Sequence, residues 1–270
     1  MKPAVTYRGR GPRLYAHPGG PGLSSAEFLP DFGGLERAFE VAYVDPRGTG
    51  ATPKPIDPRA YALDDYANDL AELIDEPSIV LGFSHGGLVA QRFAGRYPDK
   101  VSGLILASTA ARFSSDVDAA LARKVETSKG ERWLPDALDA LSQEQSGEYK
   151  DDADLARVLA RELPLYFHRF DARAAKWIDL IADHACNADA LRYFNEVEFM
   201  SIDLRAELPK IKARTIVVSG ESDFVCPPDA GRELQDGIEG SALTIIPRSG
   251  HMTYVEQPEA FYEAVVALLK

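Results

Sequence analysis

The sequence contains few cysteines and fewer basic than acidic side chains, and each shortage excludes a class of protein. Its 270 residues include only two cysteines, Cys186 and Cys226, which are too few for a disulfide framework and lack the spacing of metal ligands. We therefore expect reduced thiols, no metal site and a cytoplasmic location. The formal net charge of −12 disfavours nucleic acids and anionic membranes as partners.

Long apolar runs are also missing. No stretch is long and apolar enough to span a bilayer, and the first residues, MKPAVTYR, lack the apolar run of a signal peptide. There is no obvious internal repeat or low-complexity tract. Length and composition are those of a soluble globular protein with room for one large α/β domain and an insertion.

The most informative segment runs from residue 78 to residue 98, SIVLGFSHGGLVAQRFAGRYP. Its apolar, partly β-branched start at 79–81 predicts a buried strand. The pattern over 88–97 predicts a helix, which Pro98 ends. The residues between them, Gly82-Phe83-Ser84-His85-Gly86, match the pattern G-x-S-x-G.

This spacing suits a nucleophilic serine. A hydroxyl is a weak nucleophile until a base takes its proton, and it must stand clear of the fold to meet a substrate. A sharp turn from strand to helix would lift Ser84 to the carboxyl edge of a sheet. The strand and helix would then pass close together, leaving little room for side chains at Gly82 and Gly86.

Strand-like and helical patterns alternate on both sides of the middle of the chain. Strands are expected at 13–17, 40–45, 101–108, 214–220 and 243–247, and further helices at 61–75, 229–237 and 258–269. This alternation predicts an α/β fold, a mostly parallel sheet with helices on both faces.

The middle of the chain is charged, largely helical and without strand signal. We therefore expect a core formed by 1–111 and 209–270, with 112–208 inserted as a helical cap. The cap would lie over the carboxyl edge of the sheet, where open α/β folds bind ligands.

Two further polar side chains follow predicted strands. Asp223 comes after the strand that ends near residue 220, and His251 comes after the last strand, so both would reach the same edge as Ser84. The order Ser84, Asp223, His251 is that of the α/β-hydrolase triad. His251 would take the proton of the serine, and Asp223 would orient the imidazole. Glu221, in the same loop, is the alternative acid.

The core resembles the proline iminopeptidase (prolyl aminopeptidase) branch of the α/β-hydrolase superfamily. Gly19-Gly20-Pro21-Gly22 resembles the second half of that branch's H-G-G-P-G, and 45–50, DPRGTG, resembles its D-x-R-G-x-G. The resemblance covers roughly 13–110 and 213–269 and is only loose in the cap. Pro18 stands where the branch has histidine, and His85 where iminopeptidases have tryptophan.

The resemblance implies a serine hydrolase that forms an acyl-enzyme on small amide or ester substrates and needs no cofactor. In this family the loop with the glycine motif, here residues 19–22 and called the glycine loop, supplies one donor of the oxyanion hole. The residue after the serine supplies the other. Carried over, the two donors are the backbone N–H groups of Gly20, in preference to Gly19, and of His85. Pro21 has no N–H to offer.

Two substrate classes remain open. An aminopeptidase needs cap carboxylates to hold the substrate ammonium, for which Glu196 and Glu198 are candidates, with Gly19 as a further substrate contact. A carboxylesterase or lactonase needs only an apolar pocket. The cap aromatics available to line one are Trp133, Tyr166, Phe167, Trp177, Tyr193 and Phe194.

A third hypothesis is a non-catalytic ligand-binding protein on the same fold. The intact set of Ser84, Asp223 and His251 disfavours it. Epoxide hydrolases and dehalogenases of this superfamily use aspartate at the nucleophile position, so the serine disfavours their chemistry as well.

Overall fold

Within the described residues, seven strands form a single sheet in the order β1-β3-β2-β4-β5-β6-β7. The computed structural model describes the whole chain except residues 31, 58, 114, 115, 183 and 185, four of which fall in the predicted cap. The strands are β1 (Ala4–Gly9), β2 (Arg13–His17), β3 (Glu40–Asp45), β4 (Ser78–Phe83), β5 (Val101–Ala107), β6 (Arg214–Gly220) and β7 (Ala242–Ile246). Only the pairing of β1 with β3 is antiparallel, which confirms the mostly parallel sheet.

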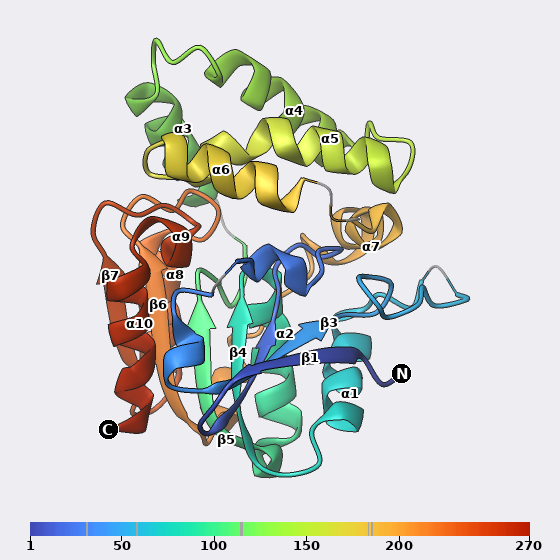
Figure 1. Cartoon of the computed structure of the whole chain (residues 1–270), viewed down its shortest axis with the longest axis vertical. Coiled ribbons are helices and arrows are strands. Elements are labelled where there is room, and N and C mark those ends of the chain that lie inside the picture. The colour runs from blue at the N-terminus through green and yellow to red at the C-terminus, as the bar shows by residue number, and fades with distance from the viewer. Residues whose placement is uncertain (31, 58, 114–115, 183, 185) are drawn as a thin grey trace.

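Helices cover both faces of the sheet (Figure 1). They are α1 (Leu63–Leu73), α2 (His85–Arg96), α8 (Pro228–Gly237), α9 (Thr253–Glu256) and α10 (Pro258–Val266). No helix in the described parts of the chain combines the length and apolar character needed to cross a membrane.

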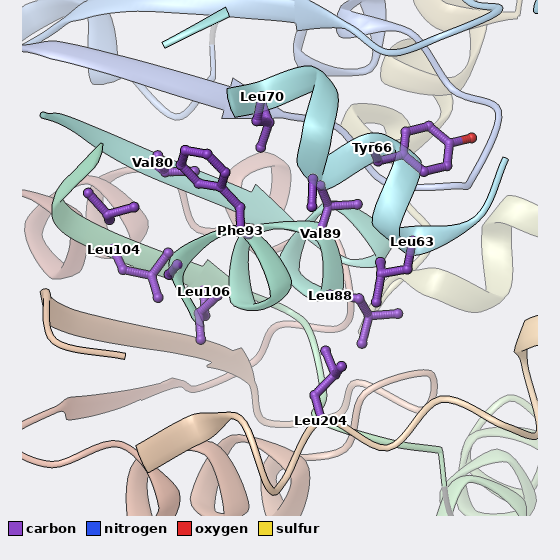
Figure 2. Packing of buried hydrophobic residues seen from close by; sticks show 14 of the residues in the cluster. Leu63, Tyr66, Leu70, Val80, Leu88, Val89, Phe93, Leu104, Leu106 and Leu204 are labelled. Carbon is purple, nitrogen blue, oxygen red and sulfur yellow. The ribbon is translucent and has the colours of Figure 1, made fainter. Parts of the chain in front are cut away.

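Alternate residues of each strand pack into opposite layers of the core, as the period of a β-strand requires. In β5, Leu104 and Leu106 face the layer formed with α1 and α2, whereas Ile105 and Ala107 face the layer that contains Phe261 of α10. Figure 2 shows the first layer, where leucine, valine and phenylalanine side chains of α1 and α2 meet those of β4 and β5. Both faces of the central strands are therefore buried, which explains why β4 and β5 read as nearly continuous apolar runs.

The segment between β5 and β6 is helical and lies at one end of the sheet (Figure 1). It contains α3 (Asp116–Thr127), α4 (Leu134–Ser146), α5 (Asp152–Glu162), α6 (Ala172–Ile181) and α7 (Ala188–Tyr193). A π-helical turn, Phe194–Glu198, continues α7. Such turns often occur at functional sites.

The turn from β4 to α2 is sharp and its backbone is strained. Ser84 has a φ of 52°, a conformation that side chains rarely adopt. A Cβ at Gly82 would collide with the carbonyl of Gly86, and one at Gly86 would collide with the carbonyls of His17 and Pro18. Helix α2 begins directly after the serine, at His85, three residues earlier than the apolar pattern predicts. Glycines in its first turn hide the helical pattern, because glycine favours no helix by itself.

We expect the substitution Gly86→Ala to lower the free energy of unfolding by about 1–3 kcal/mol, because its new methyl group meets backbone that cannot move aside. Gly95→Ala in the same helix is the matched control. A Cβ there has only ordinary contacts, 3.6 Å or more from Glu207, and alanine favours a helix by up to about 1 kcal/mol. Urea unfolding of both variants tests the close contact between β4 and α2. Equal free energies of unfolding for the two variants would contradict that contact.

Candidate active site

Asp223 and His251 form a buried pair at the carboxyl edge of the sheet. His251 Nδ1 lies 2.8 Å from Asp223 Oδ2, and both side chains are almost fully buried. The other carboxylate oxygen of Asp223 accepts the N–H groups of Val225 and Cys226, each at 2.9 Å. The carboxylate is thus fixed on both sides and holds the imidazole by Nδ1, which leaves Nε2 as the nitrogen able to exchange a proton.

The alternative acid, Glu221, lies elsewhere. Its side chain is exposed, and its carboxylate accepts the N–H of Arg248 at 3.0 Å. Of the two acids in this loop, the structure brings only Asp223 to His251.

Ser84 and His251 line the same cavity. The carbonyl of Ser84 accepts the hydroxyl of Thr109 at 2.7 Å and its N–H donates to Ala107 at 2.9 Å, so the backbone of the turn is fixed. In the described chain the serine hydroxyl is not hydrogen-bonded to the imidazole. In hydrolases without substrate this contact is often long and tightens on binding.

The backbone donors around the serine differ in whether they are already used. The N–H of Gly19 donates to Glu27 Oε2 at 2.7 Å. No acceptor among the described residues takes the N–H of Gly20 or of His85. His85 is the first residue of α2, so its N–H also carries the positive end of the helix dipole.

A cavity of about 720 Å³ separates these groups from the cap, a size typical of small-molecule sites. Its lining is mainly apolar. Of the cap aromatics named from the sequence, Tyr166, Trp177 and Phe194 line it. The remaining three, Trp133, Phe167 and Tyr193, do not.

Besides the exposed Asp118, two less accessible carboxyl groups of the cap, Glu144 and Glu162, also line this cavity. Glu162 is fully buried, and burial raises its pKa to about 8, with the nearby Glu144 as a smaller cause. One of its oxygens accepts the hydroxyl of Tyr166, and the other has no partner within the described chain. Glu144 accepts the amide of Asn195 at 3.0 Å, and burial raises its pKa as well.

A further carboxyl group of low accessibility lines the cavity, and it comes from the core. Glu27, which accepts the N–H of Gly19, is nearly fully buried and lines the cavity close to the serine. Burial raises its pKa to about 7, and the hydrogen bond from Gly19 opposes that shift. Cavities lined by buried carboxyl groups with shifted pKa values are a common mark of functional sites.

The two carboxylates expected to hold a substrate ammonium, Glu196 and Glu198, are not among the residues that line the cavity. Glu196 is exposed. Glu198 turns towards the core and accepts the N–H of Leu63 at the start of α1, at 2.9 Å. The expectation about these two residues is therefore not supported, because the π-helical turn directs them away from the cavity.

The carboxyl groups that do line the cavity left a signal in the sequence. Glu162 continues the buried stripe of α5 after Leu155 and Val158, and Glu144 continues that of α4 after Leu141. An acidic side chain on the apolar stripe of a helix must face something other than water. Glu27 follows Ser24 in the pattern S-x-x-E, which usually marks a helix cap.

The side chain of His85 packs between aromatic rings. Its ring meets those of Tyr66 and Phe194 edge-on, each at a centroid distance of 5.3 Å. Burial lowers its pKa to about 3, so the ring is neutral. A neutral ring suits this position, because a charge here would lie beside the proposed nucleophile in an apolar wall.

Comparison with known proteins places this site in a family. The chain is 26% identical to proline iminopeptidase PfmaB of Pestalotiopsis fici over 84% of this chain and 80% of that protein. It is 29% identical to a pimeloyl-[acyl-carrier protein] methyl ester esterase of Neisseria meningitidis, over 84% of this chain and 81% of that one. The solved structure of an enol-lactonase from Burkholderia xenovorans superposes with a TM-score of 0.72 at 24% identity, covering 99% and 96% of the two chains. A family profile described as the alpha/beta hydrolase fold matches residues 12–258. The chain therefore belongs to the alpha/beta hydrolase fold family and is a hydrolytic enzyme.

Proposed function

We propose that this hydrolase uses Ser84 as nucleophile, His251 as general base and Asp223 as the residue that orients the imidazole. The observation that carries the proposal is that the buried Asp223–His251 pair and the strained serine turn open into one cavity. His251 Nε2 takes the serine proton as the hydroxyl attacks the substrate carbonyl, and it then protonates the leaving group. Water releases the acyl group by the same steps.

The oxyanion of each tetrahedral intermediate would be held by the backbone N–H groups of Gly20 and His85. Among the described residues neither N–H has an acceptor, whereas the N–H of Gly19 donates to Glu27. Fixed donors in a site with little water stabilise developing charge strongly, and losing one typically costs about 100-fold to 1,000-fold in rate.

For the substrate, we propose a small amide with a free amino group, as a proline iminopeptidase-like aminopeptidase would cleave. The support is the pair Glu144 and Glu162, which lie in the mainly apolar wall of the cavity; within the described chain, one carboxylate oxygen of Glu162 has no partner. A buried carboxyl group favours its charged form when a cation arrives beside it. A substrate ammonium would supply that cation, and the apolar wall would take the rest of the acyl group.

The alternative is a carboxylesterase or lactonase for small acyl compounds. The mainly apolar lining supports it, as does the similarity to an esterase. In that case Glu162, whose pKa burial raises to about 8, stays protonated and forms a neutral polar pair with Tyr166. A non-catalytic binding protein is the third hypothesis, which labelling of Ser84 and assays of turnover test.

We expect a fluorophosphonate probe to label Ser84, because attack on phosphorus needs the same nucleophile and base as attack on a carbonyl. The variant Ser84→Ala should lose labelling and all turnover of aryl esters and arylamides. Mass spectrometry of the labelled peptide and steady-state assays check both. A Ser84→Ala protein with the parent's activity would rule out this nucleophile.

We expect Asp223→Asn to reduce kcat about 1,000-fold or more, because the amide favours the wrong imidazole tautomer. Glu221→Gln is the control from the same loop, and its kcat should change by no more than about twofold, since its exposed carboxylate accepts the N–H of Arg248 and lies away from His251. The comparison is made on one aryl ester. A damaging Glu221→Gln together with a mild Asp223→Asn would show that the acid is wrongly assigned.

We expect Glu162→Gln to reduce kcat/KM for alanine and proline arylamides about 10- to 100-fold, the value of a charge-assisted hydrogen bond. Neutral aryl esters should change by less than about threefold. Glu198→Gln is the matched control, since it removes another partly buried carboxylate that accepts a backbone N–H outside the cavity. Good ester or lactone turnover by the parent, with no arylamide turnover, would reject the aminopeptidase and leave the esterase.

A further inference from the structure

The glycine loop is held by a hydrogen bond to the carboxyl group of Glu27. Glu27 lies on the short helix η1 (Ser25–Phe28), which follows the loop, and its Oε2 accepts the N–H of Gly19 at 2.7 Å. The next residue, Gly20, carries one of the two free donors of the site and has a φ of 100°. The side chain of Glu27 therefore fixes the residue from which the direction of the Gly20 N–H is set.

The backbone of Gly19 lies between this carboxyl group and the nucleophile. A Cβ at Gly19 would come within 3.1 Å of Ser84 Cβ and within 3.2 Å of Glu27 Oε1. These contacts are tight, so even a methyl group at this position would require Ser84 or Glu27 to move by a few tenths of an ångström. A small change in the position of Glu27 is thus transmitted to the part of the loop that faces the serine.

The short helix that carries Glu27 is itself anchored at two points. The neighbouring Ser25 donates its N–H and hydroxyl to Asp45 Oδ1 at 3.0 and 2.7 Å. The carbonyl of Glu27 accepts the hydroxyl of Tyr254 at 3.0 Å, three residues after His251. The carboxyl group thus reaches the loop from a fixed base.

We propose that Glu27 is a positioning residue of the oxyanion hole, which takes the N–H of Gly19 so that the N–H of Gly20 points to the substrate carbonyl. The inference rests on the proposed serine-hydrolase function. Without this acceptor, the buried N–H of Gly19 would have to find another partner, and an unsatisfied buried donor is costly. The loop would then turn, and the donor of Gly20 would turn with it.

The role needs an acceptor more than a charge. The titratable groups that interact electrostatically with Glu27 include His251, Tyr254 and Cys186. Because burial raises the pKa of Glu27 to about 7, its carboxyl group is partly protonated at neutral pH. A neutral amide oxygen in the same place should therefore hold the loop nearly as well. Rescue of kcat by glutamine but not by alanine would distinguish a lost hydrogen-bond acceptor from a general loss of packing.

The experiment compares Glu27→Gln, Glu27→Ala and the control Glu198→Ala, which also removes an acceptor of one backbone N–H but lies outside the cavity. On a neutral aryl ester we expect kcat of Glu27→Ala to fall about 10- to 100-fold, part of the cost of a lost oxyanion donor, with KM within about threefold. Glu27→Gln should stay within about fivefold of the parent in kcat. Glu198→Ala should keep the parent's kcat. Fluorophosphonate labelling rates should follow the same order.

Thermal unfolding of each variant separates a loss of fold from a loss of geometry. If Glu27→Ala does not fold, Glu27→Asp replaces it, because its shorter side chain keeps a carboxylate but withdraws it from Gly19, and it should lose kcat about 10-fold. A parent labelled at Ser84 whose kcat survives Glu27→Ala, or falls equally with Glu27→Gln, overturns the inference alone. A parent that is neither labelled nor active overturns the proposed function and this inference with it.

Discussion

The close crossing of strand β4 and helix α2 determines where every other part of the site can lie. Glycine at 82 and 86 allows the two elements to touch, and the turn between them holds Ser84 in a strained backbone conformation above the sheet. The same crossing brings the first N–H of α2 to the serine. It also fixes the neighbouring glycine loop, since Gly86 lies against the carbonyls that precede that loop. The positions of the proposed nucleophile and of both proposed oxyanion donors thus depend on one contact.

The core of the site could be predicted because a parallel sheet gives sequence position a spatial meaning. Residues that directly follow parallel strands meet at one edge of the sheet. The strand patterns alone therefore predict that Ser84, Asp223 and His251 lie near one another. The choice of Asp223 over Glu221 is settled locally by the loop after β6, where two backbone N–H groups hold the aspartate. The start of α2 could not be predicted, because its first turn is rich in glycine.

The cap has no parallel sheet that would fix where each side chain points. A helix in an insertion can turn about its own axis, and its packing against neighbours decides which face meets the cavity. The sequence therefore offered Glu196 and Glu198 only as cap carboxylates, whereas the carboxyl groups of the cap that line the cavity are those of Asp118, Glu144 and Glu162. The better signal was an acidic residue on the buried stripe of α4 and of α5. Glu27 was hidden for another reason, because its spacing from Ser24 matches an ordinary helix cap.

Cap and glycine loop are nevertheless not independent, because one buried residue joins them. Asn187 donates its backbone N–H to the carbonyl of Gly22 at 2.8 Å, and its side-chain amide donates to the carbonyl of Gly48 at 3.1 Å and to Tyr61 at 2.9 Å. The same side chain caps α7, the helix that leads to Phe194 in the cavity wall. A shift of this part of the cap therefore pulls on the far end of the loop whose near end Glu27 holds. The two ends of the glycine loop are thus held by different parts of the fold, the Gly19 end by Glu27 of the core and the Gly22 end by Asn187 of the inserted segment.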